Sequence, residues 1–119
     1  MVTRDDVFQF FERSYDTKPE YLWDKFPNYA VFRHKKNEKW YALLMDVLPE
    51  KFNLKGDEMI EVLNLKSPPE LNGGLRERDV IFEAYHMNKE HWNSILLDRV
   101  NQLNDIEELI ETSFDLTKE

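Results

Sequence analysis

The densest run of side chains that could do chemistry is segment 85–92, with the sequence YHMNKEHW. We predict that a strand ends there and that a helix begins at Asn88, whose side chain would cap it. The free amides of a first helical turn bind anions, and Lys89 and His91 would add positive charge beside them. Trp92 would supply a flat surface for stacking. The segment is therefore a candidate site for a small anion or a phosphate backbone.

A structural role for the same segment is the alternative. In that interpretation Asn88 only caps the helix, Trp92 lies in the hydrophobic core, and the two histidines have internal partners or contact water. Metal binding by His86 and His91 is the weakest hypothesis, because two imidazoles without a third ligand make a poor site. We therefore predict neither a metal nor another cofactor.

Positive charge collects on a second segment, residues 25–39, which holds five Lys or Arg residues against one acid in a chain of formal charge −8. Arg33, Lys35 and Lys36 belong to a predicted hairpin and could contact nucleic-acid phosphates. A solvated hairpin tip is the alternative, since lysines at sheet edges also discourage aggregation. The acidic remainder of the chain would repel a polyanion, so we expect any DNA contact to be weak and salt-dependent.

Patterns typical of catalysis are absent. The chain has three glycines and no cysteine, which excludes a glycine-rich phosphate loop, a disulfide and a thiolate nucleophile. The four serines lie outside any nucleophile-elbow pattern. One of them, Ser67, fits a helix cap instead. We therefore expect a binding protein rather than an enzyme.

Signals along the rest of the chain indicate the elements that position these segments. Thr3 is placed to cap a first helix, and an irregular connection follows at 16–28, where Pro19 opens a helical turn. Strands are predicted at 29–33, 39–47, 58–65 and 79–87, the third with a helix as its alternative. Further helices are predicted to begin at Ser67, at Asn88 and near Asp105, with Gly73-Gly74 weakening the first of these.

Composition and element order indicate the fold class. Of the 119 residues, 41% are hydrophobic, which is enough for a core. We predict a single α+β domain in which a mostly antiparallel sheet is flanked by helices packed on one face. No apolar run approaches the roughly 20 residues that span a bilayer, and the N-terminus lacks a signal-peptide pattern. We expect a cytoplasmic protein with no membrane partner, and we favour a monomer.

Residues 62–98 resemble the signature region of the MmcQ/YjbR-like family of small bacterial proteins. The resemblance is carried by NLK at 64–66, by Pro-Glu-Leu at 69–71 and by YHMNKEHWNSILLD at 85–98. It extends over nearly all of residues 1–119. It implies a CyaY-like, or frataxin-like, α+β sandwich and a "double wing" arrangement for binding DNA.

The resemblance also implies which residues form the site. These are Lys66, His86, Asn88, Lys89, His91 and Trp92, with Arg33, Lys35 and Lys36 as a wing. Lys66 ends a strand, so we expect it near the 86–92 turn. The leading hypothesis is a non-enzymatic module that binds an anionic partner such as nucleic acid.

Two alternatives remain open. The first is a protein-interaction adaptor, because the aromatic residues Tyr21, Trp23 and Phe26 lie in the irregular connection and would either complete the core or form a partner surface. The second is a small-anion or metal-binding protein that uses His86 and His91.

Overall fold

The first helix is fixed by its own capping residues. The computed structural model describes residues 1–119, and α1 spans Arg4–Tyr15. The Thr3 hydroxyl accepts a hydrogen bond from the Asp6 amide at 3.2 Å, and the Asp6 carboxylate accepts one from the Thr3 amide at 2.9 Å. This reciprocal capping box confirms the predicted start of the helix. Val7 and Phe11 form its buried stripe.

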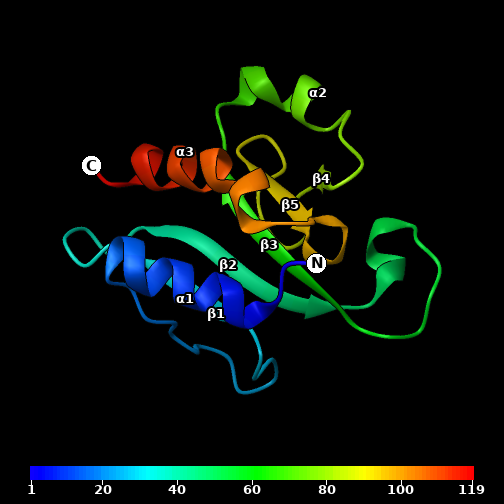
Figure 1. Ribbon diagram of the computed structural model, residues 1–119, viewed down its shortest axis with the longest axis horizontal. Coiled ribbons are helices and arrows are strands. Elements are labelled where there is room, and N and C mark those ends of the chain that lie inside the picture. Colours follow the sequence, from blue (N-terminus) through cyan, green and yellow to red (C-terminus); the bar gives the residue numbers. More distant parts are fainter.

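Five antiparallel strands form one sheet in the order β1-β2-β3-β5-β4 (Figure 1). The strands are β1 (Ala30–Arg33), β2 (Trp40–Val47), β3 (Ile60–Lys66), β4 (Ile81–Glu83) and β5 (Trp92–Leu96). The hairpin and the third strand are confirmed, and the helix alternative for 58–65 is wrong. The α+β class with a mostly antiparallel sheet is likewise confirmed.

The helix predicted from Asn88 is wrong, because its residues form β5 in the middle of the sheet. Trp92, Ile95, Leu96 and Arg99 are spaced as on a helix face, and this spacing misled the prediction. In the structure β5 pairs with β3 on one side and with β4 on the other. The strand pattern is hidden from the sequence because Asn93 and Ser94 are polar yet buried.

The strand predicted at 79–87 is much shorter than expected. Only Ile81–Glu83 pair with β5. The Tyr85 amide donates to the Ser94 hydroxyl at 3.0 Å rather than to a strand carbonyl. His86 then adopts a left-handed backbone conformation with φ of 67°. Residues 84–91 therefore leave the sheet as a loop between β4 and β5.

Ser67 does not cap a helix. Pro69 forces Pro68 into an extended conformation, so the turn begins only after Pro68, a residue that has no capping side chain. A 3-10 helix at Pro69–Leu71 leads into a single α-helical turn, α2 (Asn72–Leu75). The Ser67 side chain is buried instead, and it donates to Asn72 Oδ1 at 2.8 Å.

The last helix lies where the sequence placed it, and three further 3-10 helices join the strands. The 3-10 helices span Pro49–Phe52, Leu97–Arg99 and Leu103–Asp105, and α3 spans Glu107–Thr117. The helical turn expected at Pro19 is wrong, since Glu20 and Val31 exchange backbone hydrogen bonds in an isolated bridge. None of the helices is long and apolar enough to cross a membrane.

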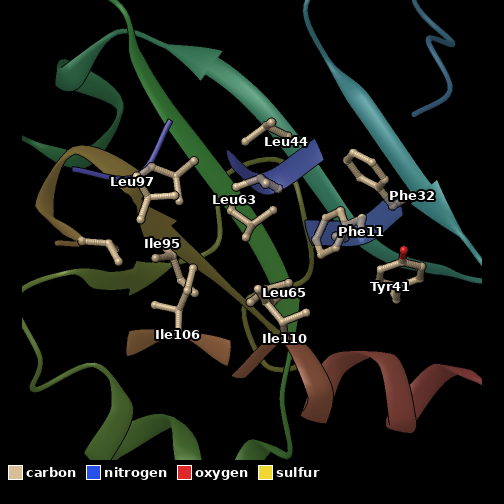
Figure 2. Close-up of a cluster of buried hydrophobic side chains, with 14 of the residues drawn as sticks. Phe11, Phe32, Tyr41, Leu44, Leu63, Leu65, Ile95, Leu97, Ile106 and Ile110 are labelled. Carbon is tan, nitrogen blue, oxygen red and sulfur yellow. The ribbon is translucent and has the colours of Figure 1, made fainter. Parts of the chain in front are cut away.

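The α-helices cover only one face of the sheet. On this face Phe11 of α1 and Ile110 of α3 pack against Phe32, Leu44 and Leu63 of the strands (Figure 2). The opposite face buries a second cluster that no α-helix covers. It is covered by the 3-10 helix Pro49–Phe52 and by segments 23–29 and 85–87. We call it the loop-covered face.

A bulge in β2 changes which side chains reach each face. The register skips Tyr41, so Tyr41 and Ala42 both lie in the helix-side core, whereas Trp40 packs on the loop-covered face. Ser113 of α3 donates to the Tyr41 carbonyl at 2.5 Å and accepts from the Lys66 amide at 2.8 Å. One buried hydroxyl thus joins α3 to both central strands.

Candidate binding surface on the loop-covered face of the sheet

Two cations of the β1–β2 hairpin, Arg33 and Lys35, form ion pairs. Arg33 donates two hydrogen bonds of 2.7 Å to the Glu20 carboxylate. Lys35 lies 2.9 Å from the Asp16 carboxylate, and this ammonium lowers the pKa of Asp16. Lys36 forms no ion pair. Two of the five cations of segment 25–39 are therefore paired with carboxylates within the protein.

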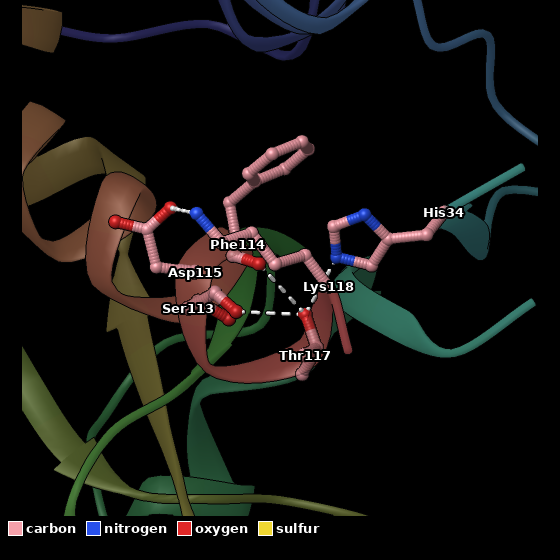
Figure 3. A network of polar contacts seen from close by, with 6 residues as sticks. All are labelled: His34, Ser113, Phe114, Asp115, Thr117 and Lys118. Atoms are coloured by element: carbon pink, nitrogen blue, oxygen red, sulfur yellow. Dashed lines mark hydrogen bonds and ion pairs between the residues drawn. The ribbon is translucent and has the colours of Figure 1, made fainter. Parts of the chain in front are cut away.

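The hairpin tip is also docked on the C-terminal end of α3 (Figure 3). His34 Nε2 is hydrogen-bonded to Thr117 Oγ1 at 2.8 Å, and Asn37 Nδ2 donates to the Thr117 carbonyl at 2.9 Å. Burial lowers the pKa of His34, and the nearby Lys118 ammonium lowers it further. The tip is thus part of the folded body, with a neutral histidine at its base.

Segment 86–92 contains no helix N-terminus. Asn88 caps a turn instead: its Oδ1 accepts from the Glu90 amide at 2.8 Å, and its carbonyl accepts from the Trp92 amide at 2.9 Å. The expected anion site made of first-turn helical amides is therefore wrong. Trp92 is half-buried and belongs to neither hydrophobic cluster, so its assignment to the core is also wrong.

Buried polar side chains of the sheet form hydrogen bonds to the 84–91 loop. Asn64, in the middle of β3, is fully buried, and its side-chain amide donates to the Tyr85 carbonyl at 2.9 Å. Ser94 donates to Asn64 Oδ1 and accepts from the Tyr85 amide. At the surface, the Lys89 ammonium donates to the Ala84 carbonyl at 2.8 Å. These bonds fix the position of Tyr85 and of the adjacent His86.

A second network of buried polar side chains forms hydrogen bonds to the end of the loop at residues 89–90. Asn93 donates to Ser67 Oγ at 2.8 Å and to Asn72 Oδ1 at 3.0 Å, and it accepts from Arg76 Nε at 2.7 Å. Asn72 donates to the Glu90 carbonyl at 2.7 Å, and Arg76 donates to the Lys89 carbonyl. The polar residues of region 62–98 thus have a structural role that the sequence analysis missed.

Lys66 lies beside this loop, as expected. It pairs with Trp92 across β3 and β5, and the next residue along the chain, Ser67, donates its amide to the His91 carbonyl at 2.9 Å. No hydrogen bond or ion pair joins this group to Arg33, Lys35 or Lys36. The predicted site residues therefore form two separate groups, the hairpin tip and the loop.

The loop-covered face carries an aromatic hollow of about 280 Å³ that the sequence analysis only partly anticipated. We call its lining the aromatic patch: Trp23, Phe26, Tyr29, Trp40, Leu43, His86 and Met87. Phe26 stacks on Tyr29 with ring centroids 4.6 Å apart and an interplanar angle of 17°. Trp23 packs edge-on against Trp40 at 5.7 Å. The His86 ring lies 6.3 Å from Phe26, so the loop closes one end of the hollow.

Positive charge borders the aromatic patch at His86. Partial burial lowers the pKa of His86, and the ammonium groups of Lys51 and Lys89 lower it further. Lys51 Nζ lies 6.0 Å from the centroid of the Tyr85 ring. Burial raises the pKa of Tyr29, and the charge of Asp46 adds to the effect. Two ammonium groups therefore lie near the His86 imidazole, and both line a neighbouring hollow that also contains Tyr85.

The structure answers the open question about the aromatic residues of the irregular connection. Trp23 is half-buried in the cluster on the loop-covered face, whereas Tyr21 and Phe26 are 54% and 43% exposed. Their aromatic character was the only signal in the sequence, and no signal marked Lys51. No group of three or more His, Asp or Glu side chains is arranged to hold a metal ion. The available chemistry is stacking together with contact to an anion.

Comparison with known proteins gives matches along almost the whole chain. The model of the YjbR family matches residues 12–116. A Bacillus subtilis (strain 168) protein, the uncharacterised YyaQ, is 52% identical over 118 residues, which is 99% of this chain and 100% of that protein.

Solved structures agree with the fold. A Pseudomonas syringae crystal structure is 50% identical, with a TM-score of 0.94, and the match covers 98% of this chain and 99% of that one. A Deinococcus radiodurans protein with a DUF419 domain is 26% identical, with a TM-score of 0.71, and the match covers 98% of this chain and 78% of that one.

Proposed function

This chain belongs to the YjbR family, and on that premise we propose that it is a non-catalytic module that binds single-stranded nucleic acid weakly through the aromatic patch. The observation that carries the proposal is the partly exposed ring of Phe26, stacked on Tyr29 and next to His86, which in turn has the ammonium groups of Lys51 and Lys89 near it. Exposed aromatic rings bind bases by stacking, and neighbouring ammonium groups bind phosphates.

A single strand fits this surface better than a duplex. Bases in a duplex are already stacked on one another, so a flat aromatic surface offers them little, whereas an unpaired base can lie on Phe26. A duplex is held mainly by cations on its phosphates. Arg33 and Lys35 are already paired with Glu20 and Asp16, and the chain carries a net charge of −8. Both facts disfavour the hairpin as the main contact.

The test is fluorescence anisotropy with a labelled single strand of about 12 nucleotides, a length within the site sizes of small single-strand-binding domains. Duplex DNA of equal length is titrated in parallel at low and near-physiological salt. We expect the single strand to bind more tightly than the duplex. Stacking is worth about 1–3 kcal/mol per base, so Phe26→Ala should weaken binding by about tenfold or more. Lys51→Glu should weaken binding and reduce its salt dependence.

Lys36→Glu is the matched control, since it makes the same charge change at an unpaired lysine of the hairpin tip. It should lower the affinity less than Lys51→Glu does. A larger effect of Lys36→Glu would assign the binding to the hairpin instead. Absence of single-strand binding even at low salt would refute the proposal.

A second candidate function is a protein-interaction adaptor. It is favoured by exposed apolar side chains in and just before the patch, Tyr21 at 54%, Leu22 at 48% and Phe26 at 43% exposure. Such neighbouring exposed residues mark many protein contact sites. Cross-linking from a photoreactive group at position 22 distinguishes this candidate. A single recurrent protein partner would support it, and chaperones alone would count against it.

A further inference from the structure

A second hollow lies on the helix-bearing face, between the α2 turn and α3. It has a volume of about 200 Å³. Three buried side chains, Leu65 of β3, Ile81 of β4 and Ile95 of β5, contribute to its lining. Leu75 of α2 and Leu109 of α3 also line it. The hollow, which we call the α2–α3 cleft, therefore offers an apolar interior of limited size.

Charges of both signs line the same cleft. Two basic residues, Lys66 and Arg78, and two acidic residues, Asp105 and Glu108, belong to its lining. None of the four takes part in an ion pair. The Asp105 carboxylate accepts one hydrogen bond, at 3.2 Å, from the Gln102 amide. Two cations and two anions thus surround an apolar interior without neutralising one another.

We propose that the α2–α3 cleft binds a free α-amino acid with an apolar side chain. The carboxylate of such a ligand complements Lys66 and Arg78, and its ammonium group complements Asp105 and Glu108. Its side chain enters the apolar interior. Leu71 also lines the cleft and is 51% exposed, so the bound side chain would cover apolar surface that now faces water.

Size and charge together limit the ligand class. A protein cavity of about 150 Å³ holds one benzene molecule, so this cleft suits a side chain of the size of leucine or phenylalanine. An inorganic anion would meet the two carboxylates and gain nothing from the apolar interior. A fatty acid would leave both carboxylates without a partner. A small zwitterion with an apolar group complements the charges of both signs and fills the apolar interior.

The test is a titration of the ¹⁵N-labelled full chain with L-leucine, L-valine and L-phenylalanine to about 10 mM, which detects binding in the millimolar range. We expect saturable shifts of the amide signals of Lys66, Asn93 and Leu109. Arg78→Gln and Glu108→Gln each remove one charge contact and should weaken binding by about tenfold. Arg13→Gln, on the exposed surface of α1, is the matched control and should leave binding unchanged.

Two analogues of leucine test the charge pairing directly. The compound 4-methylpentanoate lacks the ammonium group, and isoamylamine lacks the carboxylate. Both should bind more weakly than leucine. Equal binding of either analogue, or no saturable shift with any of the three amino acids, would overturn the proposal. Because the cleft and the aromatic patch lie on opposite faces of the sheet, Phe26→Ala should not change amino-acid binding.

Discussion

Asn64 provides the sharpest test of how the candidate site is held in place. It is fully buried in β3, donates to the Tyr85 carbonyl and accepts from the Ser94 hydroxyl. Asn64→Ala removes both hydrogen bonds, each worth about 1 kcal/mol net, and leaves two buried polar groups short of a partner. We therefore expect the free energy of unfolding to fall by about 3 kcal/mol. A domain of this size has about 5–15 kcal/mol, so the variant should still fold.

The assay is urea unfolding followed by tryptophan fluorescence, in which the change is read from the midpoint at constant slope. Asn104→Ala is the control, because Asn104 is exposed and its side chain makes no hydrogen bond, and its effect should stay within about 0.5 kcal/mol. Ser94→Ala completes a double-mutant cycle, in which we expect a coupling energy of at least about 0.5 kcal/mol.

Amide hydrogen exchange tests whether the loss of the Asn64 side chain loosens the 84–91 loop. Because Asn64 holds Tyr85, its loss should speed exchange of the amides of the 84–91 loop more than those of α1. The argument that Asn64 and Ser94 act together to position the loop would be refuted by either of two results. One is a decrease of less than about 1 kcal/mol in the free energy of unfolding of Asn64→Ala, and the other is a double mutant whose decrease equals the sum of the two single ones.

Two further predictions concern the helix-side core and the hairpin. The Tyr41 hydroxyl is buried without a hydrogen-bond partner, and burial raises the pKa of Tyr41 against the opposing effect of the nearby Thr17 hydroxyl. Tyr41→Phe should therefore leave the free energy of unfolding unchanged or raise it by up to about 1 kcal/mol, and a loss larger than that in urea unfolding would contradict this. His34 has a pKa below the ordinary 6.5, chiefly because it is buried, so between about pH 7 and 5 the unfolded chain takes up more protons than the folded one. Stability should fall as the pH decreases through that range, less steeply in His34→Gln, and identical pH profiles by thermal unfolding would exclude a contribution from His34.

Local signals were sufficient for the parts of the fold that depend on neighbouring residues. Thr3 and Asp6 lie three positions apart, and their mutual capping needs only the backbone of one helical turn. The β1–β2 hairpin likewise follows from two apolar runs joined by a short polar tip. The α+β class follows from the order of these elements. Each of these features depends on residues that lie close together in the sequence.

Tertiary contacts decided β5 and the candidate site. Trp92–Leu96 became a strand because β3 and β4 supply hydrogen-bond partners on both sides, and β3 lies far away in the sequence. Asn64, Asn93 and Ser94 are polar, so hydrophobic periodicity could not mark them as buried, and only their distant partners make burial favourable.

The charges show the same distinction between what the sequence determines and what the tertiary structure determines. The sequence by itself established that basic residues concentrate at the hairpin and that the chain as a whole is acidic. Only the folded structure brought Glu20 to Arg33 and Asp16 to Lys35, and only it brought Lys51 close to His86 beside Phe26. The charge that a surface presents depends on which groups meet across the fold, because a carboxylate beside a cation opposes the attraction of that cation for an outside anion. Composition can count such charges, but the arrangement of the chain in space determines which remain available.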